Sequence, residues 1–333
     1  MRTCITVVIL IVVLLIIIYF SLVLLNQLRC INLSKLWYPK LYKHNFKEEY
    51  TDEFTKDKKI VFVAIVRNVS KMLPRNMDFL IHIGQKYFKD YHFVLFENDS
   101  DDNTRQIIKN FIAAHPGKIT LLNCCNEGTC ECKLKQKNLY NYGSNSSTRM
   151  NKMAHYRNKY LNFVKNNFQN YDYMMVMDMD MAGTMPIHGF IDNFKIKEEW
   201  DAILSNGLSG FSFPSLGIKH ITYDEIAFEP YKKKYKYGIK NVEINKLQRK
   251  EVKKALKEKK FLRVNSAFNG AGLYRISSIL KHNPSYHSNL GCEHRGLHKN
   301  FKKVFINPAW NVYMGAQGPD SIKFLFKGVN YYW

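Results

Sequence analysis

Apolar and polar segments alternate along the chain from residue 59 to residue 207 in a way that predicts alternating strands and helices. Residues 70–87 carry apolar side chains at helical spacing, and a second such helix follows Asp101 or Asp102, either of which can cap it. Continuous apolar runs typical of buried strands occupy 59–66, 91–97 and 118–122. This alternation implies parallel strands joined by helical crossovers, as in a Rossmann-like half.

The second half of the chain continues the pattern less regularly. Residues 208–240 have no clear period and are predicted to be irregular. The remaining expected elements are a helix over 149–167, buried strands over 172–178 and 201–207, a very basic helix over 241–260, and short strands near 268–275 and 303–307. The expected fold class is therefore α/β, with a mostly parallel central sheet flanked by helices.

One apolar run stands apart at the N-terminus. Residues 5–25 are uncharged, and a helix of that length would extend about 30 Å, the thickness of a bilayer's hydrocarbon core. A cleaved signal peptide would have a shorter apolar region that ends at small residues. We therefore expect a short tail at 1–4, a single-pass transmembrane anchor at 5–25, a polar stem at 26–57 and one domain at 58–333. The flanking charges leave the membrane orientation open.

Composition narrows the class of protein further. The chain is 46% hydrophobic with a formal net charge of +22, which excludes a disordered protein and indicates attraction to anionic partners. The seven cysteines are too few for a disulfide scaffold, and the four within 124–132 predict local disulfides or free thiols. Residues 232–260 hold 13 Lys and Arg but only 3 Glu. They form either a solvated helix or a surface for anionic lipid head groups or an anionic glycan.

The strongest chemical signal is the sequence MDMDMAG at 177–183. Asp178 and Asp180 end an apolar strand, at the edge of an open α/β sheet where ligands bind. Carboxylates suit Mn²⁺ or Mg²⁺, which usually combine one or two protein carboxylates with the phosphates of a substrate. The alternative is a strand-end turn with solvated acids. The pattern favours a metal site for a nucleoside diphosphate.

A second polar segment, FENDSDDNT at 96–104, follows the second predicted strand. Glu97 and Asp99 would lie at the same edge of the sheet and could accept hydrogen bonds from a ribose or base. The same segment could equally be an Asx-rich turn that caps the next helix. Arg67 follows the first strand and would line the same crevice or a surface turn.

These segments together resemble a known family of sugar transferases. KIVFVAIVRNVSKMLPRNMDFL, VLFENDSDDNT, RMNKMAHYRNKYLNF and YDYMMVMDMD occur in the order seen in fungal α-mannosyltransferases of the mannan polymerase type and the capsule-associated type. More broadly, the chain resembles a GT-A fold glycosyltransferase. The resemblance covers residues 59–183 well and continues more loosely to 303–310.

The resemblance implies roles for individual residues. Asp178 and Asp180 match the metal-binding D-x-D, and the segment with Glu97 and Asp99 matches the nucleotide-contacting turn. Arg157 matches the arginine that precedes the D-x-D strand, and it is expected to help neutralise the phosphates of the substrate. Fungal relatives often carry a late histidine as a further metal ligand, and no histidine follows His298 here. The late histidines are His294, expected as the further ligand, and His298. Glu293 is expected to act as the general base on an acceptor hydroxyl or to hold the acceptor by hydrogen bonds. The alternative for Glu293 and His294 is a helix start with an exposed ion pair.

The leading hypothesis is a membrane-anchored, divalent-metal-dependent glycosyltransferase. It would transfer a sugar from a nucleoside diphosphate sugar, GDP-mannose or a UDP-sugar, to a hydroxyl of a glycan or glycoprotein near Asn269 and Gly270. The resemblance favours mannose and a Golgi or ER endomembrane location. The alternative is an inactive, membrane-tethered module that binds polyanions or glycans through the basic 232–260 segment. The predicted membrane span argues against nucleic acid as a partner.

Overall fold

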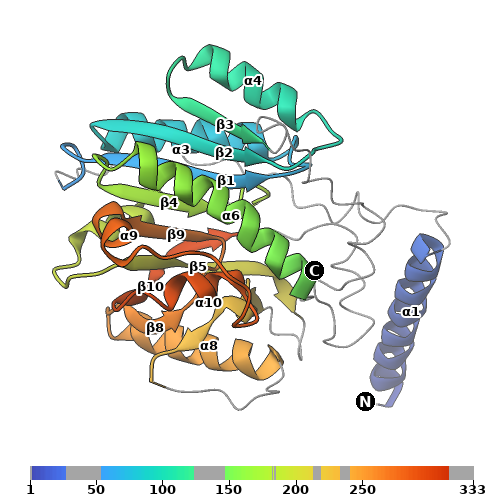
Figure 1. The fold of residues 1–333 in the computed structure, drawn as a ribbon. Helices are drawn as coiled ribbons and strands as arrows, with labels where there is room; N and C mark the ends of the chain where they lie inside the picture. Colours follow the sequence, from blue (N-terminus) through green and yellow to red (C-terminus); the bar gives the residue numbers. More distant parts are fainter. Residues whose placement is uncertain are drawn as a thin grey trace.

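The computed structural model describes residues 2–27, 54–123, 147–212 except 182 and 184, 219–232 and 241–314. Most of the predicted stem and the whole cysteine-rich segment at 124–132 lie outside the described residues. The rest of the predicted 58–333 domain is described up to Met314 and contains one central sheet with helices on both faces (Figure 1).

The sheet has ten strands in the order β3-β2-β1-β4-β9-β5-β10-β8-β7, with β6 paired to β5. Figure 1 shows this order from β3 near the top to β8 near the bottom. The strands are β1 (Lys59–Val66), β2 (Asp90–Glu97), β3 (Ile119–Asn123), β4 (Tyr173–Met177), β5 (Ala202–Ser212), β6 (Lys219–Thr222), β7 (Glu229–Pro230), β8 (Leu262–Ser266), β9 (Ala271–Arg275) and β10 (Val304–Tyr313).

Strand direction divides the sheet into two parts. The neighbours β3, β2, β1 and β4 are all parallel, as the alternation of strands and helices predicts. In the other part, β10 is parallel to β5, but β9 is antiparallel to both β4 and β5, and β8 is antiparallel to β10. The prediction of a mostly parallel sheet is therefore wrong for this half. A strand buried on both faces has the same apolar pattern whichever way it runs.

Helices cover both faces of the sheet (Figure 1). On one face, α3 (Leu73–Tyr87), α4 (Thr104–Ala114) and α7 (Ile187–Ile191) contribute to one apolar core, followed by the short 3₁₀ helix η2 (Asp192–Lys195). On the other, α6 (Ser147–Asn167), α8 (Asn241–Lys257), α9 (Ile276–His282) and α10 (Glu293–His298) pack into a second core.

Local sequence explains where these helices form. In α3, Pro74 lies in the first turn, where its missing N–H costs no hydrogen bond, and Leu73, Met77 and Leu80 recur on the buried face. In α6, Tyr160, Leu161 and Val164 are fully buried against the sheet. These buried side chains fix both helices against the sheet. The loops that join the helices to the parallel strands are thereby held in place.

The segment predicted to be irregular, residues 208–240, contains regular structure. Strand β5 continues to Ser212 and pairs antiparallel with β6, and η3 (Glu225–Ala227) and β7 follow. Strand β8 was likewise not predicted. These short strands are stabilised by pairing across the sheet, which leaves little periodic signal in their own sequences.

Residues Arg2–Gln27 form the helix α1, in which the described apolar side chains from Leu10 to Phe20 are 40–62% exposed. Within the described part of the chain, no helix has the length and hydropathy needed to cross a bilayer. The predicted transmembrane anchor at 5–25 is therefore not supported.

Candidate active site

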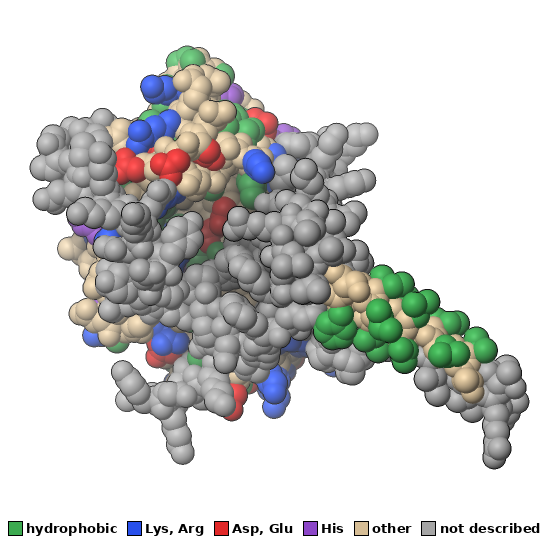
Figure 2. Space-filling model, turned by 90° about the vertical axis from the view of Figure 1, so that its right-hand side faces the viewer, with side chains coloured by type: hydrophobic (Ala, Val, Ile, Leu, Met, Phe, Trp, Pro, Cys, Tyr) green, Lys and Arg blue, Asp and Glu red, His purple; other side chains and the backbone are tan. Residues whose placement is uncertain are grey.

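The parallel strands bring several predicted residues to one edge of the sheet. In the register of β1, Val66 lies beside Glu97 of β2, and Val63 lies beside Val176 of β4. The loops that follow the three strands therefore share the carboxyl edge, where open α/β sheets bind ligands. Figure 2 looks onto this side of the molecule and shows Asp and Glu side chains gathered in its upper and middle parts.

Asp178 is held in place directly after β4. Its backbone N–H donates to the carbonyl of Gly270 (2.9 Å), and the Tyr223 hydroxyl donates to its Oδ2 (3.2 Å). Its Oδ1 lies 3.7 Å from the guanidinium of Arg157, and the side chain is 21% exposed. Burial raises the pKa of Asp178 to about 7; Arg157 opposes this shift and Asp180 adds to it. A bound cation would favour the ionised form of this carboxyl.

Arg157 joins two carboxylates inside the protein. It is 5% exposed, and its Nε donates to Oε1 of Glu293 at 3.1 Å, opposite Asp178. Its guanidinium lies over the ring of Phe268, 5.1 Å from the centroid. Both Arg157 and Glu293 were predicted to contact substrate, and the structure brings the two side chains together beside Asp178. Arg157, which is held by Glu293, thus helps to fix the position of Asp178.

His294 was predicted as a metal ligand together with Asp178 and Asp180. Its ring is 2% exposed and stacks on Phe268 at 3.8 Å between centroids. Neither ring nitrogen has a hydrogen-bond partner among the described residues. Burial lowers the pKa of His294 well below its ordinary value, so the ring is neutral at pH 7. The described residues contain no group of three or more metal-ligating side chains. His294 is therefore not assembled with the aspartates as a third ligand.

Glu97 and Asp99 shape the loop after β2. Glu97 is 1% exposed, and its carboxylate accepts from the Ser100 N–H (2.6 Å) and from Arg105 Nε (2.5 Å). Asp99 has a left-handed φ of 49° and accepts from the same Arg105 at 2.8 Å. Arg105, which sequence analysis did not single out, thus occupies both predicted nucleoside contacts. The side chain of Asp99 is 28% exposed at the carboxyl edge of the sheet.

Two other residues at this edge each have a buried polar atom without a hydrogen-bond partner among the described residues. Asn98 is 5% exposed. Within the described part of the chain its Oδ1 accepts no hydrogen bond, and the buried Nε of the half-buried Arg67 donates none. An unsatisfied buried polar atom costs about 1–3 kcal/mol and calls for an explanation. A ligand that donates to Asn98 and accepts from Arg67 would supply one.

The turn between β8 and β9 holds the backbone of Asp178 by a hydrogen bond. Asn269 is fully buried, and its amide donates to the Ser205 carbonyl (2.7 Å) and accepts from Gln248 (2.9 Å). Asn269 and Gly270 both have positive φ angles, 60° and 91°. The predicted acceptor contact at Asn269 and Gly270 is thus a tight turn that presents its carbonyl to Asp178.

Helix α3 holds the loop that contains the two aspartates. The Asn76 amide donates to the carbonyls of Met179 (3.0 Å) and Met181 (2.9 Å) from a fully buried position. Arg75 donates to the Met181 carbonyl at 3.0 Å. Neither residue was predicted from the sequence, because both lie about a hundred positions before the loop and belong to an ordinary amphipathic helix.

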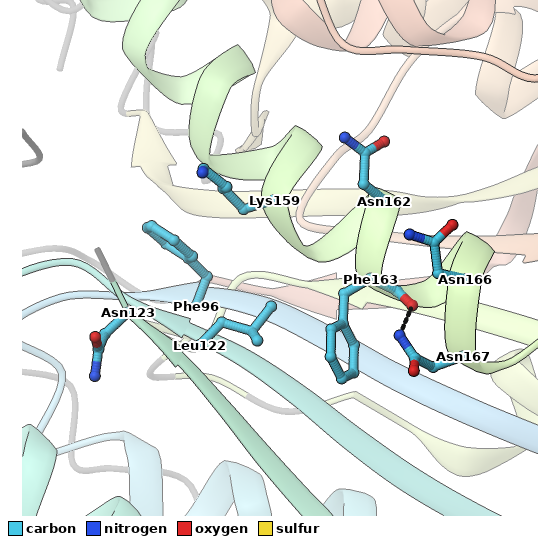
Figure 3. Close-up of a pocket in the computed structure, with 8 residues that line it drawn as sticks. All are labelled: Phe96, Leu122, Asn123, Lys159, Asn162, Phe163, Asn166 and Asn167. Atoms are coloured by element: carbon cyan, nitrogen blue, oxygen red, sulfur yellow. Dashed lines mark hydrogen bonds between the residues drawn. The ribbon is translucent and has the colours of Figure 1, made fainter. Parts of the chain in front are cut away.

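A separate cavity of about 320 Å³ lies between α6 and the strands β2 and β3 (Figure 3). Figure 3 shows Lys159 and the asparagines of α6 around Phe96 and Leu122. Neither aspartate lines it. Its lining residues are Phe96, Leu122, Asn123, Lys159, Asn162, Phe163, Asn166 and Asn167.

No family model matches the chain, and no curated protein matches its sequence. Solved structures do show similarity of fold. TarS of S. aureus, in its 1–349 form, has a TM-score of 0.41 at 11% identity over 79% of this chain and 62% of its own. It has also been solved in complex with UDP and with UDP-GlcNAc.

Two further structures are similar to the chain at the same level. The mannosyltransferase PcManGT from Pyrobaculum calidifontis, in complex with GDP-Man and Mn²⁺, has a TM-score of 0.42 at 11% identity and covers 90% of this chain and 66% of its own. GalNAc-T7 with UDP, GalNAc and Mn²⁺ has a TM-score of 0.46 at 11% identity, over 80% of this chain and 45% of its own. The chain thus matches less than two thirds of the length of each of these proteins. Similarity of this degree does not assign an activity.

Proposed function

We propose that this protein is a divalent-metal-dependent glycosyltransferase that moves a sugar from a nucleoside diphosphate sugar to a hydroxyl of a glycan or glycoprotein. The observation that carries the proposal is the placement of Asp178 and Asp180 after β4. Asp178 is oriented by Gly270, Tyr223 and Arg157 at the carboxyl edge of the parallel strands. A polyanion-binding surface would gain nothing from fixing a carboxylate there.

The two carboxylates suit a metal ion whose remaining ligands come from the phosphates of the substrate. Two carboxylates are what Mn²⁺ or Mg²⁺ needs from a protein when the phosphates of a nucleotide supply further ligands. Asp178 and Asp180 would hold the ion, which would neutralise charge on the departing nucleoside diphosphate. The unpartnered atoms of Arg67 and Asn98 would face the nucleotide at the neighbouring strand ends.

Asp224 is a better placed general base than Glu293, because Glu293 is committed to Arg157. Asp224 follows Tyr223, which contacts Asp178, and burial together with the charges of Glu293 and Asp178 raises the pKa of Asp224 well above its ordinary value. A carboxylate accepts a proton from an acceptor hydroxyl only in its ionised form, and a cation bound beside Asp178 would favour that form of Asp224. Asp224→Asn would lower kcat while nucleotide binding stays unchanged, and the asparagine tolerates the left-handed φ of 58°.

The choice of sugar and the location in the cell are part of this proposal and rest on the family resemblance alone. That resemblance favours GDP-mannose as donor and a Golgi or ER endomembrane. Microscopy of the tagged full chain with organelle markers tests the location independently of activity.

The decisive experiment is an assay of nucleoside diphosphate release by the full chain. GDP-mannose and a panel of UDP-sugars are each supplied with Mn²⁺ or with EDTA, with acceptor glycans present. Wild type is compared with Asp180→Ala and with the control Asp192→Ala, which removes an exposed carboxylate paired to Lys195. We expect release from one donor, dependent on metal, lost in Asp180→Ala and kept in Asp192→Ala. Loss of one preorganised electrostatic contact costs roughly 2.7–4 kcal/mol, or on the order of a hundredfold or more in rate.

A folded protein that releases nothing from any donor would contradict the proposal and favour the binding module. Release that persists in EDTA and in Asp180→Ala would contradict the assignment of the metal site.

A further inference from the structure

The outer surface of α8 carries a row of lysines. Its inner surface is fixed by the buried residues Ile244, Gln248, Val252 and Ala255. At about 100° per residue, the positions i, i+4, i+7 and i+11 fall within roughly 60° of one another, opposite this buried side. These positions are the exposed residues Lys246, Lys250, Lys253 and Lys257, which we call the lysine stripe.

Within the described part of the chain, none of the four stripe lysines forms a salt bridge with an acidic side chain. Beside the stripe, Lys254 pairs at 4.0 Å with Glu258, which directly follows α8. Like charges one turn apart on a helix repel one another at a cost of a few tenths of a kcal/mol per pair. The packing of the inner surface of α8, including the Gln248–Asn269 hydrogen bond, holds the lysines together against this repulsion.

The shape of the lysine stripe indicates an extended anionic partner. Eleven residues of helix span about 16 Å, so the four ammonium groups form a line rather than a pocket for one phosphate. A second exposed surface points to lipid. In α1 the described side chains from Leu10 to Phe20 leave apolar area open that lipid would cover and a soluble anionic glycan would not. A basic patch combined with an apolar segment is the pairing that gives stable attachment to anionic membranes.

We propose that the lysine stripe of α8 docks on anionic lipid head groups. This proposal is independent of the proposed enzymatic activity. The opposite side of α8 bonds to Asn269, which is followed by Gly270, the hydrogen-bond acceptor of Asp178. Docking would therefore hold the candidate active site within about two helix diameters of the lipid surface.

Amine acylation of the full chain, followed by mass spectrometry, tests this docking whether or not α1 also attaches to lipid. The protein is bound to vesicles of phosphatidylcholine alone or with phosphatidylserine added, at low and at high salt. The controls are four exposed lysines on other elements, Lys109, Lys197, Lys281 and Lys299. We expect acylation of the lysine stripe to slow about fivefold or more on anionic vesicles at low salt, because each lysine near such a surface gains about fivefold in binding. The control lysines would react at unchanged rates.

Equal reactivity of the lysine stripe on neutral and anionic vesicles would overturn the proposal. Protection by soluble heparin but not by anionic vesicles would also overturn it, in favour of a glycan partner.

Matched variants distinguish binding by the lysine stripe from attraction by the net charge of the protein. Changing the four stripe lysines to glutamine removes the same charge as changing the four control lysines. The preference for anionic over neutral vesicles, measured by flotation, would fall on the order of a hundredfold in the stripe variant. An equal fall in the control variant would show general attraction by the net charge and would overturn the proposal.

Discussion

Charges buried beside one another set the properties of the candidate site at the scale of single residues. Arg157 lies between Asp178 and Glu293, with all three side chains largely removed from water. Such a group is stable only as a whole, because removing one member leaves an unpaired buried charge. The arginine therefore acts on the chemistry through the position and ionisation of Asp178.

Arg157→Met would destabilise the fold by about 3–5 kcal/mol, because Asp178 and Glu293 would lose their shared cation in a buried place. The double variant Arg157→Met with Glu293→Gln removes one of the two stranded charges and would recover a large part of this loss. Urea unfolding monitored by circular dichroism measures both. Equal stability of the single and double variants would show that the three groups are not coupled.

His298 gives the fold a sensitivity to acid. It is 1% exposed, with its Nδ1 2.9 Å from the Ser266 hydroxyl and its Nε2 3.0 Å from the Tyr274 hydroxyl. Burial lowers the pKa of His298 from 6.5 to about 3. Above pH 6.5 the ring is neutral in both the folded and unfolded chain. Between pH 6.5 and about 3 only the unfolded chain takes up the proton, so stability falls as the pH falls.

This proton uptake would reduce the free energy of unfolding by about 1.4 kcal/mol for each pH unit below 6.5. In His298→Gln that component of the pH dependence would disappear, although the variant would be less stable at neutral pH. Unfolding free energies measured between pH 4 and pH 7 give the slope. The exposed His188, changed to glutamine, serves as control, and an unchanged slope in His298→Gln would contradict the assignment.

At the scale of elements, α3 holds the loop after β4 by side-chain hydrogen bonds to its carbonyls. Asn76→Ala would leave the carbonyls of Met179 and Met181 without their buried donor. We expect a loss of stability of about 1–3 kcal/mol and weaker Mn²⁺ binding, because Asp180 lies between those two residues. Calorimetric titration with Mn²⁺ and thermal unfolding measure the two effects.

Gln106→Ala is the control for this variant, since it removes an exposed amide that donates to Asn110 of the same helix. Normal metal binding in a destabilised Asn76→Ala would show that α3 supports the fold but does not position the aspartates.

Elements with a strong local pattern were predictable, and those stabilised across the sheet were not. The predicted strand 59–66 coincides with β1, and the predicted helix 149–167 differs from α6 by two residues at its start. In contrast, β6 and β8 are short strands whose stability depends on partners distant in sequence. The very basic helix expected over 241–260 corresponds to α8, but only the burial of its other side shows which lysines face the solvent.

At the scale of the whole molecule, one continuous sheet joins the parallel and mixed halves. Strand β9 pairs with β4 on one side and β5 on the other, so hydrogen bonds run without interruption from β3 to β7. The core on each face also contains residues from both halves. Phe62 and Phe305 belong to one, and Val63 and Ile306 to the other.

The sheet domain would therefore unfold in a single cooperative transition. Trp200 and Trp310 are buried in the second half of the chain and report its packing by fluorescence, while far-ultraviolet circular dichroism reports all helices and strands. The two probes would give coincident urea transitions. Fluorescence that changes well before or after the dichroism would show two independently stable parts.

The sequence by itself determined the alternation of strands and helices in the first half, the parallel pairing of those strands and the place of Asp178 and Asp180 at their carboxyl edge. These features follow from local periodicity and from the geometry of helical crossovers. Only the tertiary structure decided which charged groups meet. Burial pairs Arg157 with Glu293, and Glu97 with Arg105, because a charge taken out of water must find a partner within reach, and that partner depends on packing between distant segments.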